Sequence, residues 1–305
     1  MNERTIKDLP ASVNRRLLNQ AREQGLAFQD LCQRFAMERF LYRLSVSPHA
    51  DRFVLKGALM LFVWNPEPSR QTMDIDLLGR VANDPALVRT MFRDICTQDV
   101  PPDGMAFDPE TVDVEVITRE ATYEGVRVSL RGRLGNTRVL IRVDIGFGDR
   151  VVPEPEMLDY PTLLDFPAPR LRAYGRETAI AEKLHAMVQL GTLNSRMKDF
   201  FDIWSLSRSF EFDGRILAEA VRETFAGRGH QAPPEPLALT DDFGRSREKH
   251  VQWTSFLRKR RVSAPADFAE VMEQVRAFLL PIVVAVASDA SPPARWTPPG
   301  PWASQ

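Results

Sequence analysis

Residues 53–76 read FVLKGALMLFVWNPEPSRQTMDID, and this stretch decides the fold. A short apolar run, Phe53–Leu55, ends at Lys56-Gly57 and is followed by an apolar segment of helical length. A proline-containing loop then leads to Asp74-Ile75-Asp76 at the start of a second short apolar run. The pattern predicts a strand, a tight turn into a helix, and a second strand that carries two carboxylates.

These two aspartates are the first functional signal. Residues two apart in a strand project to the same face, so the side chains of Asp74 and Asp76 would stand side by side. Two such carboxylates repel each other unless a cation lies between them. Mg²⁺ or Mn²⁺ binds carboxylates together with substrate phosphates, whereas a solvent-facing edge pair would show the same spacing without a metal. We expect a divalent-metal site here.

Three further strands are predicted at residues 112–116, 126–130 and 138–145, with Gly135-Asn136 as a hairpin turn. Asp144 lies within the last strand, where a buried carboxylate needs a partner or a metal. Lys56-Gly57-Ala58 stands at a strand-to-helix junction, where backbone N–H groups can approach a phosphate. A phosphate-binding turn, a D-x-D strand and a third aspartate together indicate a nucleotidyltransferase site of the DNA-polymerase-β type.

The rest of the chain indicates the fold class and the domains. Strands and helices mix up to residue 170, and the helix after Leu55 predicts one α/β crossover. Residues 171–287 show helical periodicity only, and residues 288–305 contain five prolines without an apolar period. We expect an α+β protein with N-terminal helices (1–50), a mixed-sheet nucleotidyltransferase core with flanking helices (51–170), an all-helical part (171–287) and a disordered tail (288–305).

Composition excludes several classes of protein. The 305 residues include 40 basic and 41 acidic side chains, so any nucleic-acid surface must be a local patch. Two cysteines are too few for a disulfide framework and are typical of a reducing cytoplasm. The longest apolar run, at 278–287, is about half of a bilayer span, and no signal peptide is recognisable. We expect a cytoplasmic protein without a membrane partner. Motifs for a P-loop, a serine hydrolase or a paired-histidine zinc site are absent from the sequence.

Residues 53–76 resemble the opening motif of the AbiEii/AbiGii toxin nucleotidyltransferase family, which includes the mycobacterial MenT toxins. Residues 179–186 (AIAEKLHA) resemble its lysine helix, and residues 198–202 (KDFFD) resemble its K-D-x-x-D element. The resemblance implies a polymerase-β-like core whose active site is completed by the helical part. It also implies a toxin that transfers a nucleoside monophosphate from an NTP to RNA, with the tRNA 3′ end as acceptor, and so blocks translation.

The same resemblance implies the partners and the cofactor. A cognate antitoxin encoded alongside, a tRNA acceptor and Mg²⁺ or Mn²⁺ are expected, with no DNA partner and a place in phage defence. Two alternatives stay open: a catalytically inactive binding module of the same fold, or transfer to a protein or a small molecule. An inactive module would be expected to lose one of Asp74, Asp76 and Asp144, and all three are present.

The resemblance also assigns residues to the site. Asp74 and Asp76 would hold the metal, and Asp144 would complete the carboxylate set or orient the acceptor hydroxyl. The remaining expected residues bind the nucleotide or support catalysis: Lys56, Gly57, Ala58 and Lys183 for the triphosphate, and Asp199 before Asp202 as a base or as support for Lys183. Arg70, in the loop before the D-x-D strand, could also bind the triphosphate bidentately, or be an exposed loop arginine. Ala58 stands where the family often has glycine or serine, so only its backbone is expected to bind.

Simpler structural interpretations of these helical residues are also open. Lys183 could be a snorkelling lysine beside an apolar stripe, and Asp202 could pair with Lys198 one turn away. In either interpretation, we expect Lys183→Met to leave the fold intact. Only in the catalytic interpretation should it cost about 2–4 kcal/mol of transition-state stabilisation.

A basic segment near the C-terminus predicts an RNA-binding surface. Residues 245–261 contain seven basic side chains, one acid and two interleaved aromatics, Trp253 and Phe256. Basic side chains with aromatics suit an RNA backbone with stacked bases, whereas a charged helix whose aromatics lie in the core would show the same pattern. The residues expected to contact RNA are Arg245, Arg247, Lys249, Arg258 and Lys259.

Overall fold

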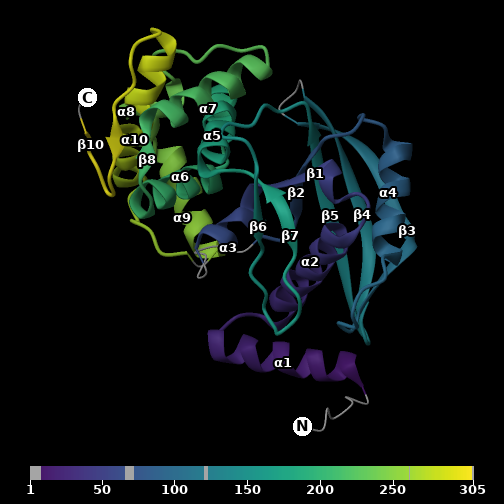
Figure 1. Ribbon diagram of the computed structural model, residues 1–305. Helices are drawn as coiled ribbons and strands as arrows, with labels where there is room; N and C mark the ends of the chain where they lie inside the picture. The colour runs from purple at the N-terminus through teal and green to yellow at the C-terminus, as the bar shows by residue number, and fades with distance from the viewer. Residues whose placement is uncertain (1–7, 66–71, 120–122, 261, 304–305) are drawn as a thin grey trace. The chain divides into compact units, whose positions relative to one another are not determined.

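The computed structural model describes residues 8–65, 72–119, 123–260 and 262–303 (Figure 1). The chain divides into two compact units. Unit 1 comprises residues 1–148 and 156–173, and unit 2 comprises residues 149–155 and 174–305. Both units are therefore discontinuous in sequence, unlike the consecutive domains expected from the sequence.

Unit 1 combines a sheet with four helices among its described residues. The helices are α1 (Leu9–Gln24), α2 (Phe28–Val46), α3 (Met60–Trp64) and α4 (Pro85–Thr97). The strands are β1 (Phe53–Lys56), β2 (Ile75–Gly79), β3 (Met105–Arg119), β4 (Tyr123–Leu134), β5 (Thr137–Phe147), β6 (Glu156–Asp159) and β7 (Arg170–Ala173).

These strands form one mixed sheet in the order β3-β4-β5-β2-β1-β7-β6. β2 pairs with β5 and β1 pairs with β7 in parallel, and the other neighbours are antiparallel. The predicted fold class, an α+β protein with a mixed sheet and flanking helices, is confirmed. The crossover predicted after Leu55 is wrong, because α3 has only five residues and the chain returns as the antiparallel neighbour β2.

The apolar sides of α2 and α4 cover one face of the sheet (Figure 1). Phe40 of α2 packs against Phe92 of α4 and against Phe107 of β3, with ring centroids 5.7 and 5.5 Å apart. The inward residues of β4 and β5, such as Val128 and Ile141, are fully buried. Since side chains alternate along a strand, the other face of β4 and β5 carries their polar residues.

Unit 2 is mainly helical. Its helices are α5 (Arg176–Leu190), α6 (Met197–Ser209), α7 (Gly214–Gly227), α8 (Asp241–Gly244), α9 (Arg247–Arg260) and α10 (Phe268–Ala287). Three two-residue strands form a small sheet in the order β10-β9-β8: β8 (Phe212–Asp213), β9 (Arg295–Trp296) and β10 (Trp302–Ala303). Within the described residues, no helix combines the length and apolar character needed to cross a membrane.

The segment Asp149–Pro155 belongs to unit 2 although it lies between β5 and β6 in sequence. Thr178 of α5 holds it, because its Oγ1 accepts from the Val152 amide at 3.1 Å and donates to the Val152 carbonyl at 2.7 Å. An ion pair between Asp149 and Arg228, with 3.3 Å between Oδ1 and Nη2, adds a second attachment.

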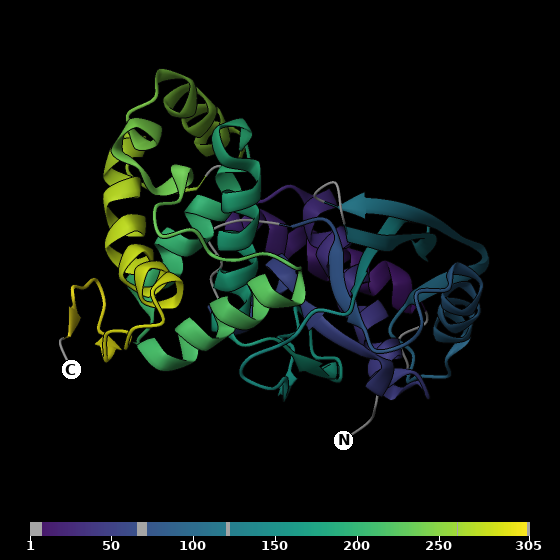
Figure 2. The same ribbon diagram turned by 90° about the horizontal axis from the view of Figure 1, so that it is seen from above.

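The prediction of a disordered tail is wrong for residues 288–303. This segment lies beside α10 (Figures 1 and 2), and the ring of Trp302 stacks on Phe278 with centroids 5.6 Å apart. Trp296 is fully buried, and its indole N–H donates to the Ser207 carbonyl at 2.6 Å. Trp296 and Trp302 thus anchor this segment to the helical core. Their role was not predicted from the sequence, because the segment lacks helical periodicity.

Trp296→Ala should lower the free energy of unfolding by about 3–5 kcal/mol, because it removes a buried ring and leaves a cavity. Arg295→Ala, at the exposed neighbouring position, should change it by about 0–1 kcal/mol. Urea denaturation followed by circular dichroism measures both. Equal stability of Trp296→Ala and the parent protein would show that the tail does not pack.

Candidate active site

A row of charged residues crosses four neighbouring strands of unit 1. The register places Lys56 of β1 opposite Asp76 of β2, Asp76 opposite Asp144 of β5, and Asp144 opposite Arg127 of β4. Directly opposed residues share a face of the sheet, so two central carboxylates stand between two cations. Lys56 and Asp144 are buried, with 4% and 7% of their surfaces exposed. The structure thus brings together two of the predicted carboxylates and the predicted lysine.

Gly57 follows this row at the strand-to-helix junction. Its φ of +72° lies in the left-handed region, which favours glycine. A Cβ atom at this position would lie 2.2 Å from Oδ2 of Asp76, a distance that no side chain could tolerate. The absence of a side chain therefore lets the Asp76 carboxylate lie against the backbone of the junction, as a phosphate-binding turn beside a metal site requires.

Arg127 was not identified from the sequence. Its Nε and Nη2 donate to the two carboxylate oxygens of Asp144 at 2.7 and 2.9 Å, a bidentate charge-assisted pair. This pair supplies the partner that a buried Asp144 needs. A usable signal was present, since counting back from a two-residue turn at Gly135-Asn136 sets Arg127 opposite Asp144.

Asp74 lies one residue before β2 and is half-buried. Burial raises the pKa of its carboxyl group, and the neighbouring carboxylates of Asp144 and Asp76 raise it further, while Arg142 and Arg127 lower it. A divalent cation would relieve this crowding, and carboxylate oxygens are the ligands that Mg²⁺ prefers. Among the described residues, no three His, Cys, Asp or Glu side chains form a complete metal site. The donor set fits a metal bound by two carboxylates and completed by substrate phosphates.

A second charged cluster lies in unit 2, between α5 and α6. The Lys183 ammonium is 3.1 Å from Oδ1 of Asp199 and 2.7 Å from Oδ2 of Asp202, and both carboxylates are fully buried. Arg196 approaches the other oxygen of Asp199, with Nε 2.7 Å away. The structure thus brings the predicted lysine into contact with both predicted aspartates. Lys183 is tied to buried charges and does not snorkel.

The predicted RNA-binding residues at positions 245–259 divide into two groups. Arg245, Arg247, Arg258 and Lys259 are exposed. Lys249 is only 3% exposed, and its Nζ donates to the carbonyls of Thr192 and Asn194 at 2.8 Å each. Its assignment to an RNA surface is therefore corrected, because its charge is used inside unit 2.

The aromatic side chains of this basic segment are packed with other aromatics. Trp253 is fully buried against Phe268, and its ring stacks on Phe256 with centroids 5.5 Å apart. Trp253 is therefore a core residue and offers no stacking surface to a base. Arg70, the last nucleotide-binding residue predicted from the sequence, lies outside the described residues.

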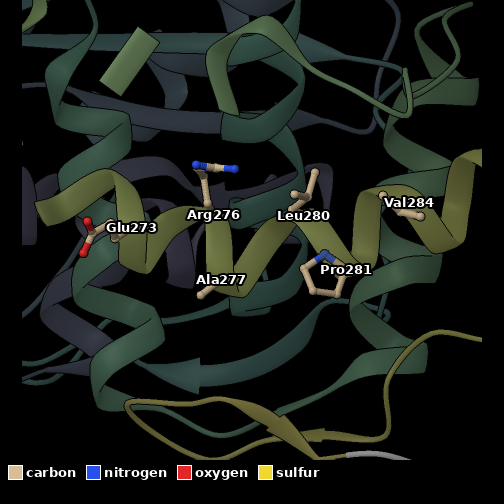
Figure 3. Close-up of a pocket in the computed structure, with 6 residues that line it drawn as sticks. All are labelled: Glu273, Arg276, Ala277, Leu280, Pro281 and Val284. Carbon is tan, nitrogen blue, oxygen red and sulfur yellow. The ribbon is translucent and has the colours of Figure 1, made fainter. Parts of the chain in front are cut away.

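An open groove of about 540 Å³ runs along the outer side of α10 (Figure 3). Its lining consists of Glu273, Arg276, Ala277, Leu280, Pro281 and Val284. The lining contains a single carboxylate and none of the predicted site residues, so this groove does not have the chemistry of the candidate active site.

A mixed sheet whose neighbouring strands bring two aspartates together beside a glycine junction has the geometry expected of a nucleotidyltransferase. Residues 39–274 match the AbiEii family, described as nucleotidyl transferase toxins of type IV toxin–antitoxin systems. The match includes the charged row and the cluster around Lys183. The chain belongs to this family.

Two solved structures from Helicobacter pylori are similar in fold. JHP933 is 14% identical, and the similarity covers 82% of this chain and 93% of JHP933 with a TM-score of 0.48. A second protein, proposed to be a nucleotidyltransferase, is 16% identical over 87% of this chain and 97% of its own, with a TM-score of 0.45. A search of curated proteins found no match.

Gly57→Ala should combine backbone strain with displacement of Asp76, and we expect nucleotidyl transfer to fall at least about 100-fold. Gly25→Ala is the matched control, because Gly25 has a φ of +64° and no neighbour within 4 Å of an added Cβ. Backbone strain should cost each variant about 1–2 kcal/mol of stability, and the clash with Asp76 should add to the loss in Gly57→Ala. Urea denaturation and a transfer assay separate the two effects, and full activity of Gly57→Ala would contradict the assigned geometry.

Lys183→Met should lower the free energy of unfolding by about 3–5 kcal/mol, because it leaves two buried carboxylates without their shared cation. This replaces the sequence-based expectation that the fold would be unaffected. The triple variant Lys183→Met/Asp199→Asn/Asp202→Asn removes the buried charges and should recover part of the loss. If Lys183→Met unfolds at the same urea concentration as the parent, the buried pairing is incorrect.

Proposed function

We propose that this protein transfers a nucleoside monophosphate from an NTP to the 3′ end of tRNA and thereby blocks translation in the cytoplasm. The observation that carries the proposal is the approach of Asp76, beside Asp144, to the backbone at Gly57. The acceptor hydroxyl oxygen would bond to the α-phosphorus, the bond to the β-phosphate would break, and pyrophosphate would leave. The hydroxyl proton would pass to solvent.

Within unit 1, each residue of the row has a separate task. Asp74 and Asp76 would hold Mg²⁺ or Mn²⁺, which when bound orients the triphosphate and neutralises its charge. The backbone at Gly57 and Ala58 and the ammonium of Lys56 would bind phosphate oxygens. Asp144, whose oxygens accept from Arg127, would accept a hydrogen bond from the acceptor hydroxyl and orient it.

In unit 2, Lys183 would bind the triphosphate, supported by Asp199 and Asp202. The family match spans this helix as well as the row, which favours a common task for both. Two buried carboxylates fix the position of the Lys183 ammonium, so little side-chain entropy would be lost on binding. The exposed residues Arg245, Arg247, Arg258 and Lys259 would add to the acceptor surface. A cognate antitoxin would oppose the activity, in keeping with a place in phage defence.

The test incubates the purified protein with Mg²⁺, each α-labelled NTP in turn, and total tRNA. We expect label on RNA, and Asp76→Asn should reduce the rate at least about 100-fold while keeping the shape of the side chain. Asp159→Asn is the control, since Asp159 of β6 is an exposed sheet aspartate outside the row. Circular dichroism confirms that both variants are folded.

The acceptor assignment has its own outcomes. Label on a protein or on a small molecule instead of RNA would show that the acceptor is wrong while the transfer chemistry is right. Absence of metal-dependent NTP binding by titration calorimetry would show an inactive binding module and overturn the proposal.

A further inference from the structure

The outer face of the β4–β5 hairpin carries five arginines. Register places Arg127 opposite Asp144, Ser129 opposite Arg142, Arg131 opposite Leu140, and Arg133 opposite Arg138. Because the bidentate pair fixes Arg127 and Asp144 on one face, alternation puts the other four arginines on the same face. In a chain of net charge −1, this is a strong local concentration of positive charge.

These arginines are accessible. Arg131, Arg133, Arg138 and Arg142 are exposed, and within the described residues none of the four has an ion-pair partner. The opposite face of the hairpin is the buried one that packs against α2, so the arginine face points away from that core. We name these four residues together with Arg127 the arginine ladder.

The ladder begins at the candidate active site. Arg127 binds Asp144, and the charge of Arg142 lowers the pKa of Asp74 while burial raises it. Arg127 to Arg133 spans six residues of extended chain, roughly 20 Å at about 3.4 Å per residue. A ligand lying along the ladder would therefore extend from the carboxylates towards the hairpin turn.

The adjoining strand β3 has the opposite charge. Glu115 lies opposite Arg127 and Asp108 opposite Arg131, whereas Asp113, opposite Ser129, is paired with Arg89 of α4. An anionic polymer would be attracted to β4 and β5 and repelled at the β3 edge, which confines its path to the hairpin.

The chemistry of the ladder fits a sugar-phosphate backbone. Arginine binds phosphate bidentately, and alternate residues of a strand place guanidinium groups at regular intervals. Between Arg127 and Arg133 on β4 and between Arg138 and Asp144 on β5, the one large apolar side chain on this face is Leu140, and none is aromatic. Protein interfaces depend on buried aromatic or apolar anchors, and single-stranded bases need stacking platforms.

We propose that the arginine ladder docks the phosphate backbone of the RNA acceptor and directs its 3′ end to the carboxylate row. The inference rests on the proposed function for the identity of the acceptor. It assigns acceptor binding mainly to β4 and β5, whereas the sequence indicated chiefly the basic segment at residues 245–261. Binding through phosphates is independent of base sequence, so acceptor choice would depend on the shape of the RNA.

The experiment measures binding of fluorescently labelled, deacylated tRNA by anisotropy at several salt concentrations without NTP. The variant is Arg131→Ala/Arg133→Ala/Arg138→Ala, which leaves Arg127 and the carboxylates in place. We expect affinity to fall at least about tenfold and the slope of log K against log salt concentration to decrease by about 2–3. The control is a triple variant at exposed positions elsewhere, Arg170→Ala/Arg215→Ala/Arg222→Ala. It has the same net charge as the ladder variant and should bind tRNA like the parent protein.

Unchanged tRNA affinity and salt slope in the ladder variant would overturn the inference, as would an equal loss in the control variant. Loss of binding to the cognate antitoxin with unchanged tRNA affinity would also overturn it and identify a protein-binding face. Because binding is measured without NTP, the result is independent of transfer. A ladder variant that loses tRNA binding supports the docking surface even if the transfer assay shows no labelled RNA.

Discussion

The structure of the candidate site depends on the apposition of two carboxylates on neighbouring strands. Asp76 and Asp144 face each other across the β2–β5 pair, where like charges are destabilising unless cations compensate. Lys56 and Arg127, at the two ends of the same row, provide that compensation within the protein. The register of these four strands therefore decides whether the four charged side chains meet. A slip of one residue in a strand would turn its charged side chain to the other face of the sheet and away from its partners.

The charged row of unit 1 and the Lys183 cluster of unit 2 differ in how the negative charges of their carboxylates are compensated. In unit 1, Asp76 stays partly accessible beside the Gly57 backbone, as a group that exchanges ligands must. In unit 2, Asp199 and Asp202 are fully buried and hold a lysine that keeps 16% of its side chain exposed. The first arrangement suits a variable ion and substrate, and the second fixes one ammonium group in position.

The sequence was informative where local chemistry decides the structure. The strand–turn–strand of residues 53–79 and the three later strands follow from apolar patterning. The same patterning points to Gly57 at the strand-to-helix junction, and the φ of Gly57, +72°, is one that favours glycine. Arg127 was missed although the turn at Gly135-Asn136 sets the hairpin register that places it opposite Asp144. The pairing of β2 with β5, which brings Asp76 to Asp144, joins distant segments and has no such local signal. Lys249 and Trp296 were misjudged for a related reason: a charge run and a proline-rich segment look solvated until tertiary contacts bury single members.

The discontinuity of the two units affects how the chain can be divided and synthesised. The chain leaves unit 1 after Gly148, returns at Glu156, and leaves again after Ala173. A fragment that ends at Ala173 carries Asp149–Pro155 without Thr178, which receives and donates the hydrogen bonds of Val152. A fragment that begins at Tyr174 lacks that segment altogether. During translation, these bonds can form only after α5 has been synthesised, so a segment made between two strands of unit 1 finds its partner in a helix that is made later.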